Sequence, residues 1–272
     1  MKSFVADKNR KLSKLALIHL TDLSYVALMQ AFRKKDVKVN GKRTDKDLTL
    51  NVGDVVEIYY TPTENKGYSV VFCDKNVVVI NKKGGCASED VFQSLKKEYS
   101  EIYFIHRLDR NTSGLMIFAL NSQSETELLS GFKNRTFEKL YKARVKGVPK
   151  NKKAVLTAYL KKDAESALVS VFDTEKKGSV LIKTGYEVID EYGEYSDLLV
   201  TLYTGKTHQI RAHLAHIGHA ILGDGKYGDF ALNNALKLKR QMLTAVSLTL
   251  YFSAQSPLYY LNGKNFTVQS EF

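Results

Sequence analysis

The sequence predicts an α+β protein in which a small N-terminal α/β domain precedes a long, mixed and mainly antiparallel sheet with few flanking helices. Three observations lead to this prediction. Residues 1–60 combine two short helical patterns with a hairpin signal, and a polar segment with one of only three prolines follows them. From residue 137 onward, most apolar segments alternate or form short runs, as strands do. The 272 residues suffice for one large domain with a small appendage.

The first 60 residues are expected to form a domain of their own. Strand-like segments flank an Asn40-Gly41 pair, which is a strong signal for a two-residue hairpin turn. The expected elements are helices over about 12–19 and 24–33, strands over 37–39 and 55–60, and a linker over 61–67. Lys and Arg number 12 in this segment against 7 Asp and Glu, so it carries +5 of the chain's net charge of +12.

Residues 68–272 are expected to form the main domain. Its first elements should be a strand at 77–80, a helix at about 89–98, a strand ending at Leu120 and a helix running to about Asn134. Ser122 and Glu125 have the spacing of a capping box, which predicts the start of that last helix.

The rest of the chain is mostly strand-like. Strands are expected over 140–145, 155–160, 167–172, 180–190, 198–203 and 243–252, and near the C-terminus. One helix is expected over about 207–217, because Ile210, Leu214 and Ile217 recur at helical spacing. That spacing puts Arg211 at the border of the apolar stripe.

A charged loop stands directly before a continuous apolar strand in the segment 104–118, FIHRLDRNTSGLMIF. Such loops frequently carry function. Asp109 lies between Arg107 and Arg110, and neighbouring guanidinium groups favour an ionised carboxylate, which makes Asp109 a candidate nucleophile or base. The alternative is a purely structural pair between Asp109 and an arginine. Gly114 is expected to let the backbone turn into the strand.

Charge and cysteine content limit the classes of function. A net charge of +12 favours a polyanionic partner such as nucleic acid over a small neutral metabolite, although a solvated basic surface would also account for it. Cys73 and Cys86 form neither a CxxC pair nor a disulfide framework, which fits a reducing compartment. No segment has the roughly 18 apolar residues of a membrane span, and no signal-peptide pattern is present. A cytoplasmic protein is expected.

Two glycine-rich patterns resemble nucleotide-binding motifs but lack a required part. The segment 223–228 matches GxGxxG, but no acidic residue follows about 20 positions later, so a glycine-rich turn is expected instead of a dinucleotide site. The segment Gly205-Lys206-Thr207 lacks the earlier glycine of a phosphate-binding loop.

Two further patterns contain residue types of known sites without their geometry. Four histidines lie between 208 and 219, but only three of them keep helical spacing and no glutamate accompanies them, so no metal site is expected. His106, Asp109 and Ser113 have the residue types of a catalytic triad, yet nothing in the spacing places Ser113 against the imidazole.

A basic stretch runs from Lys133 to Lys153 with nine Lys and Arg residues against one acid. Phe132, Phe137 and Tyr141 are interleaved with these cations. Cations neutralise phosphates and aromatic faces meet unstacked bases, so the stretch suits contact with RNA. The alternative is an exposed edge strand that lysines keep soluble. Strand alternation puts Tyr141 on the same face as Phe137.

Three segments together resemble the successive motifs of the RluA-type pseudouridine synthases, which convert uridine in RNA to its C-glycoside isomer. They read HRLDRNTSGL, KLYKARVKG and TGKTHQIRAHLAHIGHAILGDGKYG. The resemblance extends from about Tyr68 to the C-terminus and implies the pseudouridine synthase fold with a central RNA-binding cleft. Residues 10–60 resemble the α-L RNA-binding module familiar from a small-subunit ribosomal protein.

The resemblance implies roles for individual residues. Asp109 corresponds to the catalytic aspartate, Tyr141 to the active-site tyrosine, and Arg211 to the basic residue that pairs with the aspartate. This moves the expected partner of Asp109 from an adjacent arginine to a distant one. Arg107 corresponds to the arginine that helps displace the target base. The other RNA contacts expected in these motifs are His106, Thr112, Lys206, His208 and Gln209.

The implied reaction needs no cofactor and no metal. Breaking the bond between ribose and uracil nitrogen requires a group that is anionic at neutral pH, which an aspartate provides. The carboxylate could attack the sugar, add to the uracil ring or remove a ribose proton. Tyr141 is expected to pack on the base and to act as base or relay for the carbon 5 proton. The uridine must also be flipped from its stack.

Large-subunit ribosomal RNA is the expected substrate, because the appended RNA-binding module is typical of that subgroup. Transfer RNA is the second candidate, and a non-catalytic RNA-binding ribosome-assembly factor is the alternative from another class. A monomer is expected. The sequence departs from the family pattern at four positions outside the three core residues: Lys83 and Ala220 replace prolines, Lys206 an arginine and Thr244 a histidine.

Overall fold

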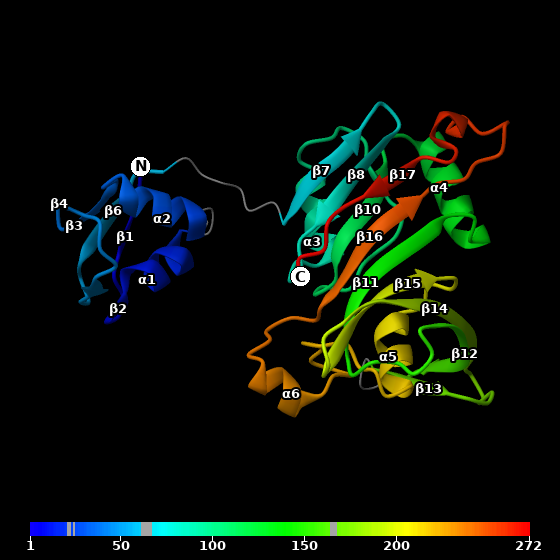
Figure 1. Cartoon of the computed structure of the whole chain (residues 1–272). Helices are drawn as coiled ribbons and strands as arrows, with labels where there is room; N and C mark the ends of the chain where they lie inside the picture. The colour runs from blue at the N-terminus through cyan, green and yellow to red at the C-terminus, as the bar shows by residue number, and fades with distance from the viewer. Residues whose placement is uncertain (21–22, 24, 61–66, 164–167) are drawn as a thin grey trace. The chain divides into compact units, whose positions relative to one another are not determined.

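The computed structural model describes residues 1–20, 23, 25–60, 67–163 and 168–272 (Figure 1). The chain divides into two compact units, Met1–Lys66 and Gly67–Phe272. Except for Gly67, the linker expected at 61–67 lies outside the described residues. Within the described ranges, no helix combines the length and apolarity that crossing a bilayer requires.

The N-terminal unit combines two helices with a small sheet. Its elements are β1 (Lys2–Val5), β2 (Arg10–Lys11), α1 (Leu12–His19), α2 (Tyr25–Arg33), β3 (Val37–Val39), β4 (Lys42–Thr44), β5 (Thr49–Leu50) and β6 (Val55–Ile58). One sheet has the order β1-β6-β3-β4, and β2 pairs with β5. Asn40 and Gly41 have φ of 50° and 78°, the left-handed pair that a type I′ turn requires, so the expected hairpin is confirmed. Leu15, Leu28 and Ile58 are buried in its core.

The main unit contains most of the secondary structure. Its elements are β7 (Tyr68–Cys73), β8 (Val77–Lys82), α3 (Ser88–Leu95), β9 (Tyr103–Phe104), β10 (Ser113–Ala119), α4 (Ser122–Asn134), β11 (Glu138–Lys146), β12 (Lys153–Lys162), β13 (Val169–Phe172), β14 (Val180–Glu191), β15 (Tyr195–Leu202), α5 (Gln209–His216), α6 (Phe230–Ala235), β16 (Leu243–Thr249), a 3₁₀ helix (Tyr259–Leu261) and β17 (Asn265–Thr267).

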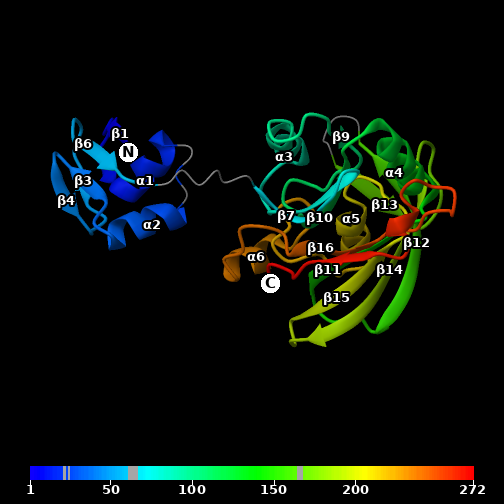
Figure 2. The same cartoon turned by 90° about the horizontal axis from the view of Figure 1, so that it is seen from above.

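These strands form one mixed sheet with the order β13-β12-β14-β15-β11-β16-β10-β8-β7 (Figure 1). Strand β9 adds beside β10, and β17 adds beside β16. In the described part of this sheet, only β10 and β16 pair in parallel. Helix α5 packs against β13 and β14 (Figure 2). The expected α+β fold with a long, mainly antiparallel sheet is therefore confirmed.

Strands β8 and β10 are buried on both faces. On one face, Ile80 packs in the same core cluster as Val91 of α3. On the other face, Val79 packs in the cluster that contains Leu128 of α4. A strand covered on both sides carries continuous apolar residues rather than alternating ones. This explains why the charged loop ends abruptly in an apolar run.

Gly114 is required where β10 approaches β16. Its φ is +112°, and a Cβ at this position would lie 2.3 Å from the carbonyl oxygen of Ala245. The turn expected at Gly114 therefore has a steric cause. Next to it, the hydroxyls of Ser113 and Thr244 are hydrogen-bonded at 2.8 Å, so Ser113 is not aligned with an imidazole and the triad is not formed.

Two helix starts differ from the prediction. The capping box at Ser122 is wrong, because the extended Asn121 one residue earlier accepts the Ser124 N–H at 2.8 Å with its own side chain. Helix α5 begins at Gln209 rather than at 207, because His208 has a left-handed backbone with φ of 55°. Helix α6 and five strands, β1, β2, β5, β7 and β9, were not expected from the sequence. The start proposed for β13 at 167 lies outside the described residues.

Candidate active site

A cavity of about 230 Å³ opens where the charged loop, β11 and the start of α5 meet. It contains all three residues that the sequence nominated for catalysis. Its lining residues are Arg107, Leu108, Asp109, Thr112, Tyr141, Leu202, Gly205, Lys206, Thr207, His208, Gln209, Ile210, Arg211 and Leu243. Four separate parts of the chain, 107–112, 141, 202–211 and 243, therefore build this one cavity.

The backbone on both sides of Asp109 is tied to neighbouring elements. The Ser88 hydroxyl donates to the Leu108 carbonyl at 2.8 Å and accepts the Leu108 N–H at 3.0 Å. Lys82, which is fully buried, donates from Nζ to the carbonyl oxygen of Arg110 at 3.1 Å. Burial lowers the pKa of Lys82 to about 8. These anchors fix the point from which the Asp109 side chain leaves the loop.

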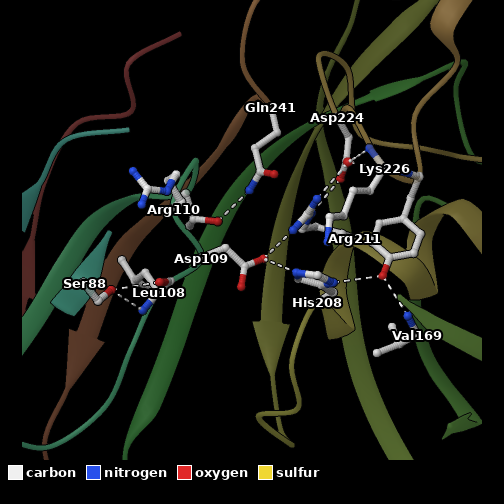
Figure 3. Close-up of polar contacts among 12 residues, drawn as sticks. Ser88, Leu108, Asp109, Arg110, Val169, His208, Arg211, Asp224, Lys226 and Gln241 are labelled. Atoms are coloured by element: carbon white, nitrogen blue, oxygen red, sulfur yellow. Dashed lines mark hydrogen bonds and ion pairs between the residues drawn. The ribbon is translucent and has the colours of Figure 1, made fainter. Parts of the chain in front are cut away.

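Arg211 lies between two carboxylates (Figure 3). Its Nη1 donates to Asp109 Oδ2 at 2.7 Å, while Nε and Nη2 donate to Asp224 at 2.7 and 2.9 Å. The Arg211 side chain is 7% exposed, Asp224 is fully buried, and Asp109 is 22% exposed. Arg211 is thus inside the protein and not at the border of an apolar stripe, because α5 is covered on all sides at this turn.

The two carboxylates hold this arginine unequally. Burial by itself would lower the pKa of Arg211, but the hydrogen bonds and charge of Asp224, and then those of Asp109, raise it overall. Burial opposes ionisation of Asp224, yet Arg211 and the backbone N–H groups of Lys226 and Tyr227 bring its pKa below the usual value. Asp224 is therefore a permanent structural anion, and it leaves one guanidinium nitrogen to orient Asp109.

The sequence interpretation missed Asp224. It lies in the segment 223–228, which ends the third family motif but was expected to form only a glycine-rich turn, with no site residue assigned in it. The turn is present: a Cβ at Gly223 would lie 2.0 Å from the Arg240 carbonyl oxygen. A signal for Asp224 existed, because an acid between two glycines in a tight turn can accept the N–H groups that follow it. Nothing in the local sequence indicated that both oxygens of Asp224 also accept hydrogen bonds from Arg211.

His208 faces Asp109 from the other side of the cavity. Its Nδ1 lies 2.9 Å from the Tyr227 hydroxyl, which also accepts the Val169 N–H at 2.9 Å (Figure 3). Its Nε2 lies 3.9 Å from Asp109 Oδ2, beyond hydrogen-bond reach. Burial lowers the pKa of His208, although the Asp109 charge opposes this. The left-handed backbone of His208 aims the ring into the cavity.

Tyr141 reaches the cavity from β11, where the pairing with β16 shifts register between Leu140 and Tyr141. Such bulges re-aim side chains and are common beside active sites. Tyr141 is 8% exposed. Burial, and after it the charge of Asp109, raise the pKa of Tyr141 above its usual range. The resting side chain is therefore a phenol that can donate or relay a proton, rather than a phenolate base.

One of the expected RNA contacts, Gln209, is used inside the protein. The Gln209 amide is 2% exposed, and it accepts from Thr204 Oγ1 and Lys206 N and donates to Lys183 O and Thr184 Oγ1. All its hydrogen-bonding capacity is satisfied, so Gln209 positions the cavity wall and is not free to bind RNA.

His106 and Thr112 are also engaged. His106 Nε2 accepts the Ile117 N–H at 3.2 Å, and burial lowers its pKa to about 3, so the ring carries no charge for a phosphate. Thr112 accepts a hydrogen bond from Gln241 at 2.6 Å while it lines the cavity. Arg107 is exposed and pairs with Glu89 at 2.8 Å.

Arg110 does not pair with Asp109. Its guanidinium group lies 3.8 Å from Asp90 instead. The structural pair between Asp109 and an adjacent arginine, left open by the sequence, is therefore not formed.

The histidine cluster consists of side chains with separate partners. His213 lies 3.0 Å from the Thr184 hydroxyl, His216 lies 2.8 Å from Asp173, and His219 lies 3.0 Å from the Lys146 carbonyl. Over the described ranges, no three His, Cys, Asp or Glu side chains come together as metal ligands would.

The chain is similar to known RNA-modifying enzymes. The sequence model of the family described as RNA pseudouridylate synthase matches residues 66–216. Ribosomal large subunit pseudouridine synthase C of Vibrio vulnificus is 29% identical in a match of 236 residues that covers 77% of this chain and 74% of that protein. An uncharacterized RNA pseudouridine synthase of Chlorobaculum parvum is 32% identical over 225 residues, 73% of this chain and 69% of that protein.

Solved structures agree on the fold. Human RNA pseudouridylate synthase domain containing 1 has a TM-score of 0.61 at 24% identity, with 69% of this chain and 80% of that chain covered. The family match spans more than half of the sequence and includes the loop that carries Asp109 as well as helix α5. The chain belongs to the RNA pseudouridylate synthase family, and it is an RNA pseudouridine synthase of the RluA type.

Proposed function

We propose that the protein isomerises specific uridines of large-subunit ribosomal RNA, with Asp109 as the catalytic carboxylate and Arg211 and Tyr141 as its partners. The main observation that supports this proposal is the environment of Asp109. Asp109 is the partly exposed member of an otherwise buried group of charges, with Oδ2 held by Arg211 at 2.7 Å. A carboxylate that is oriented but still accessible suits attack on a substrate.

The reaction neither adds nor removes atoms. The bond between ribose carbon 1′ and uracil nitrogen breaks, the base turns, and carbon 5 bonds to carbon 1′ in its place. Carbon 5 then loses its proton, while the former glycosidic nitrogen gains one. The proposed role of Asp109 is the first step, and the phenol of Tyr141 would relay the proton in the last. Arg211 orients the carboxylate and balances its charge.

Support for the ribosomal substrate comes from the names of similar proteins, among them ribosomal large subunit pseudouridine synthase D of Haemophilus influenzae, 31% identical over 212 residues. The positive charge of the N-terminal unit also supports an RNA substrate. We assign residues 1–60 the role of an RNA-binding module of the α-L type, because a helix pair on a small sheet accompanies an excess of five positive charges. A monomer acting in the cytoplasm is part of the same proposal.

The test is a map of pseudouridines in RNA from cells with and without the protein, made by carbodiimide modification and primer extension. The expected result is the loss of particular large-subunit sites, with recovery by the wild-type chain but not by Asp109→Asn. Asp90→Asn is the matched control, because Asp90 is 70% exposed and pairs with Arg110 outside the cavity.

Sites lost only from transfer RNA would replace the ribosomal substrate. An unchanged map, or full recovery by Asp109→Asn, would reject the catalytic assignment in favour of an RNA-binding assembly factor.

A further inference from the structure

A second cavity of about 420 Å³ adjoins the catalytic one. The two share Arg107, Tyr141, Leu202, Gly205 and Lys206, so a strand of RNA with its uridine in the first cavity would continue into the second. The remaining lining residues come from the loop before β10, from the end of α4 and from β11.

The second cavity is lined by cations and by no carboxylate. Its basic residues are Arg107, Lys133, Arg135, Lys139 and Lys206. Arg107 pairs with Glu89, whereas within the described residues none of the other four side chains has an acidic partner within 4 Å. An anion would therefore meet uncompensated positive charge there.

The ion pairs divide the cations of the basic stretch 133–153 into two groups. Lys142 and Arg144 share the buried Asp197, and Lys146 pairs with Asp229. Lys152 and Lys153 pair with glutamates of β14. These five cations have acidic partners within the protein, so the contact with RNA expected for the whole stretch is narrowed to the cations that line the second cavity, Lys133, Arg135 and Lys139. Phe137, which was expected to contact RNA, does not do so, because it is 3% exposed and packs in the core.

Among these cations, Lys139 is the one whose charge a bound anion would stabilise most. It precedes Tyr141 by two residues on β11, and both side chains line this cavity. Lys139 is half-buried, and burial first and then the charge of Arg135 lower its pKa. Its Nζ lies 5.5 Å from the centre of the Phe132 ring, a weak partner compared with a charged one. A bound anion would offset both the burial of the Lys139 charge and its repulsion by Arg135.

The cavity has an uncharged aromatic wall. The rings of His106 and Phe132 stack at 4.4 Å with an interplanar angle of 24°, and Phe137 meets Phe132 edge-on at 5.2 Å. His106 is held neutral, as described above, and its Nε2 is occupied by the Ile117 N–H. The positive charge of the cavity therefore comes only from Lys and Arg.

Arg135 occupies a position that favours another residue. It ends α4 with φ of 59° and ψ of 33°, the left-handed conformation in which glycine is the usual residue. Its backbone N–H caps the helix, but no hydrogen bond or ion pair of its guanidinium group is present in the described structure. An arginine here costs backbone strain without a gain inside the protein, which points to an external partner.

We infer that this second cavity, through Lys139 and Arg135, binds the phosphodiester group next to the target uridine. The inference rests on the proposed function for the identity of the RNA, but it concerns binding and not isomerisation. A phosphate suits the site because several cations converge without a carboxylate, and because the cavity opens from the one assigned to the base. The contact would carry no sequence information and would fix the register of the strand.

The test measures binding of the full chain to a nine-nucleotide RNA that has one central uridine among adenosines. Equilibrium affinity is recorded over a range of salt concentrations. For Lys139→Gln and Arg135→Gly, the slope of log affinity against log salt should become shallower by up to about 0.7, the value for one single-strand phosphate contact. Lys161→Gln, an exposed lysine of β12 outside both cavities, should leave the slope unchanged.

Arg135→Gly also separates binding from structure. Because glycine relaxes the left-handed conformation, this variant should have a melting temperature equal to or above that of the wild type while its RNA affinity falls. A structural arginine would give a lower melting temperature and an unchanged slope. That result, or equal slopes for all variants, would overturn the inference.

The last arm replaces the two phosphodiesters beside the uridine with neutral methylphosphonates. The replacement should weaken binding to the wild-type chain and have a smaller effect on Lys139→Gln, because the same contact is already lost. Equal losses in both proteins would reject the site. All measurements are repeated in Asp109→Asn, so that a failure of isomerisation, which would sink the proposed function, leaves this result intact.

Discussion

Replacing Asp224 with Asn should reduce catalysis even though Asp224 does not line the catalytic cavity. The side chain is fully buried and accepts four hydrogen bonds, two from Arg211 at 2.7 and 2.9 Å and two from the N–H groups of Lys226 and Tyr227 at 2.8 and 3.1 Å. Asn has nearly the same shape, but it lacks the negative charge and one of the two acceptor oxygens.

Two consequences can be estimated. Removing one partner of a buried ion pair typically costs about 3–5 kcal/mol of folding stability, and in this variant Arg211 would keep only the partly exposed Asp109 as an anionic partner. Arg211 would also lose one of the two hydrogen bonds that it donates to residue 224. Its side chain would then shift toward Asp109, the remaining anion, and this shift would affect catalysis. A displacement of about 1 Å at a reacting group can cost on the order of 100-fold in rate. We therefore expect kcat to fall by about 100-fold.

A matched control is available in Asp197. It is also fully buried and holds an arginine in the same bidentate way, with Arg144 Nε and Nη2 at 2.6 and 2.9 Å, but this pair does not line the catalytic cavity. Asp197→Asn should lose comparable stability and retain its kcat. The assay is single-turnover formation of pseudouridine, well below the melting temperature of each variant. Equal kcat losses in the two variants would refute a specific role for Asp224.

Four further predictions address other parts of the structure. Tyr141→Phe should fold normally and lower kcat by about 100-fold or more if the phenol relays a proton, and an unchanged single-turnover rate would limit Tyr141 to packing. Gly114→Ala should lower the free energy of unfolding by about 2–3 kcal/mol in denaturant melts, because the added Cβ meets the Ala245 backbone; a loss below 1 kcal/mol would contradict the close approach. His106 has its pKa lowered from 6.5 to about 3, first by burial and then by Lys139, so the unfolded state binds the extra proton and stability should fall as pH drops from 6.5 toward 3, by up to about 1.4 kcal/mol per pH unit. His106→Gln should flatten that part of the pH profile, and an unchanged profile would exclude His106 as its source. Deleting residues 1–66 should weaken RNA affinity and reduce its salt dependence, and an equal slope would mean that this unit does not contact phosphates.

The fold was predictable where a local pattern has one physical interpretation. Asn40-Gly41 fixes a hairpin because the pair adopts left-handed backbone easily, and the apolar run 115–119 fixes a doubly covered strand. Helix ends were less predictable. Ser122 and Asn121 are both good caps, and only the backbone of Asn121 decides between them. His208 shifted the start of α5 because its left-handed backbone does not continue a right-handed helix.

The site was predictable to the extent that its residues stand in recognisable motifs. Asp109 was nominated from local charge, and its observed partner Arg211 was expected only from the resemblance, since 102 positions separate them. Gln209 stands in the same motif but is used for internal hydrogen bonds. A motif thus marks a residue as important to the site without saying whether it faces the substrate or the protein. Burial and hydrogen-bond saturation make that distinction.

Asp224 explains how Arg211 can be buried in the protein and also orient Asp109. A buried guanidinium group needs an anion to exist inside the protein, and an anion that must also react cannot be fully committed to it. The structure divides these demands between two carboxylates. Asp224 is buried and takes two guanidinium nitrogens together with two backbone N–H groups, whereas Asp109 takes one nitrogen and stays partly exposed. Because Asp224 already balances the arginine, the proposed reaction could neutralise Asp109 without leaving Arg211 as an unpaired buried charge. In the proposed mechanism, the glycine-rich turn that resembled a nucleotide motif is therefore the element that leaves Asp109 available to react.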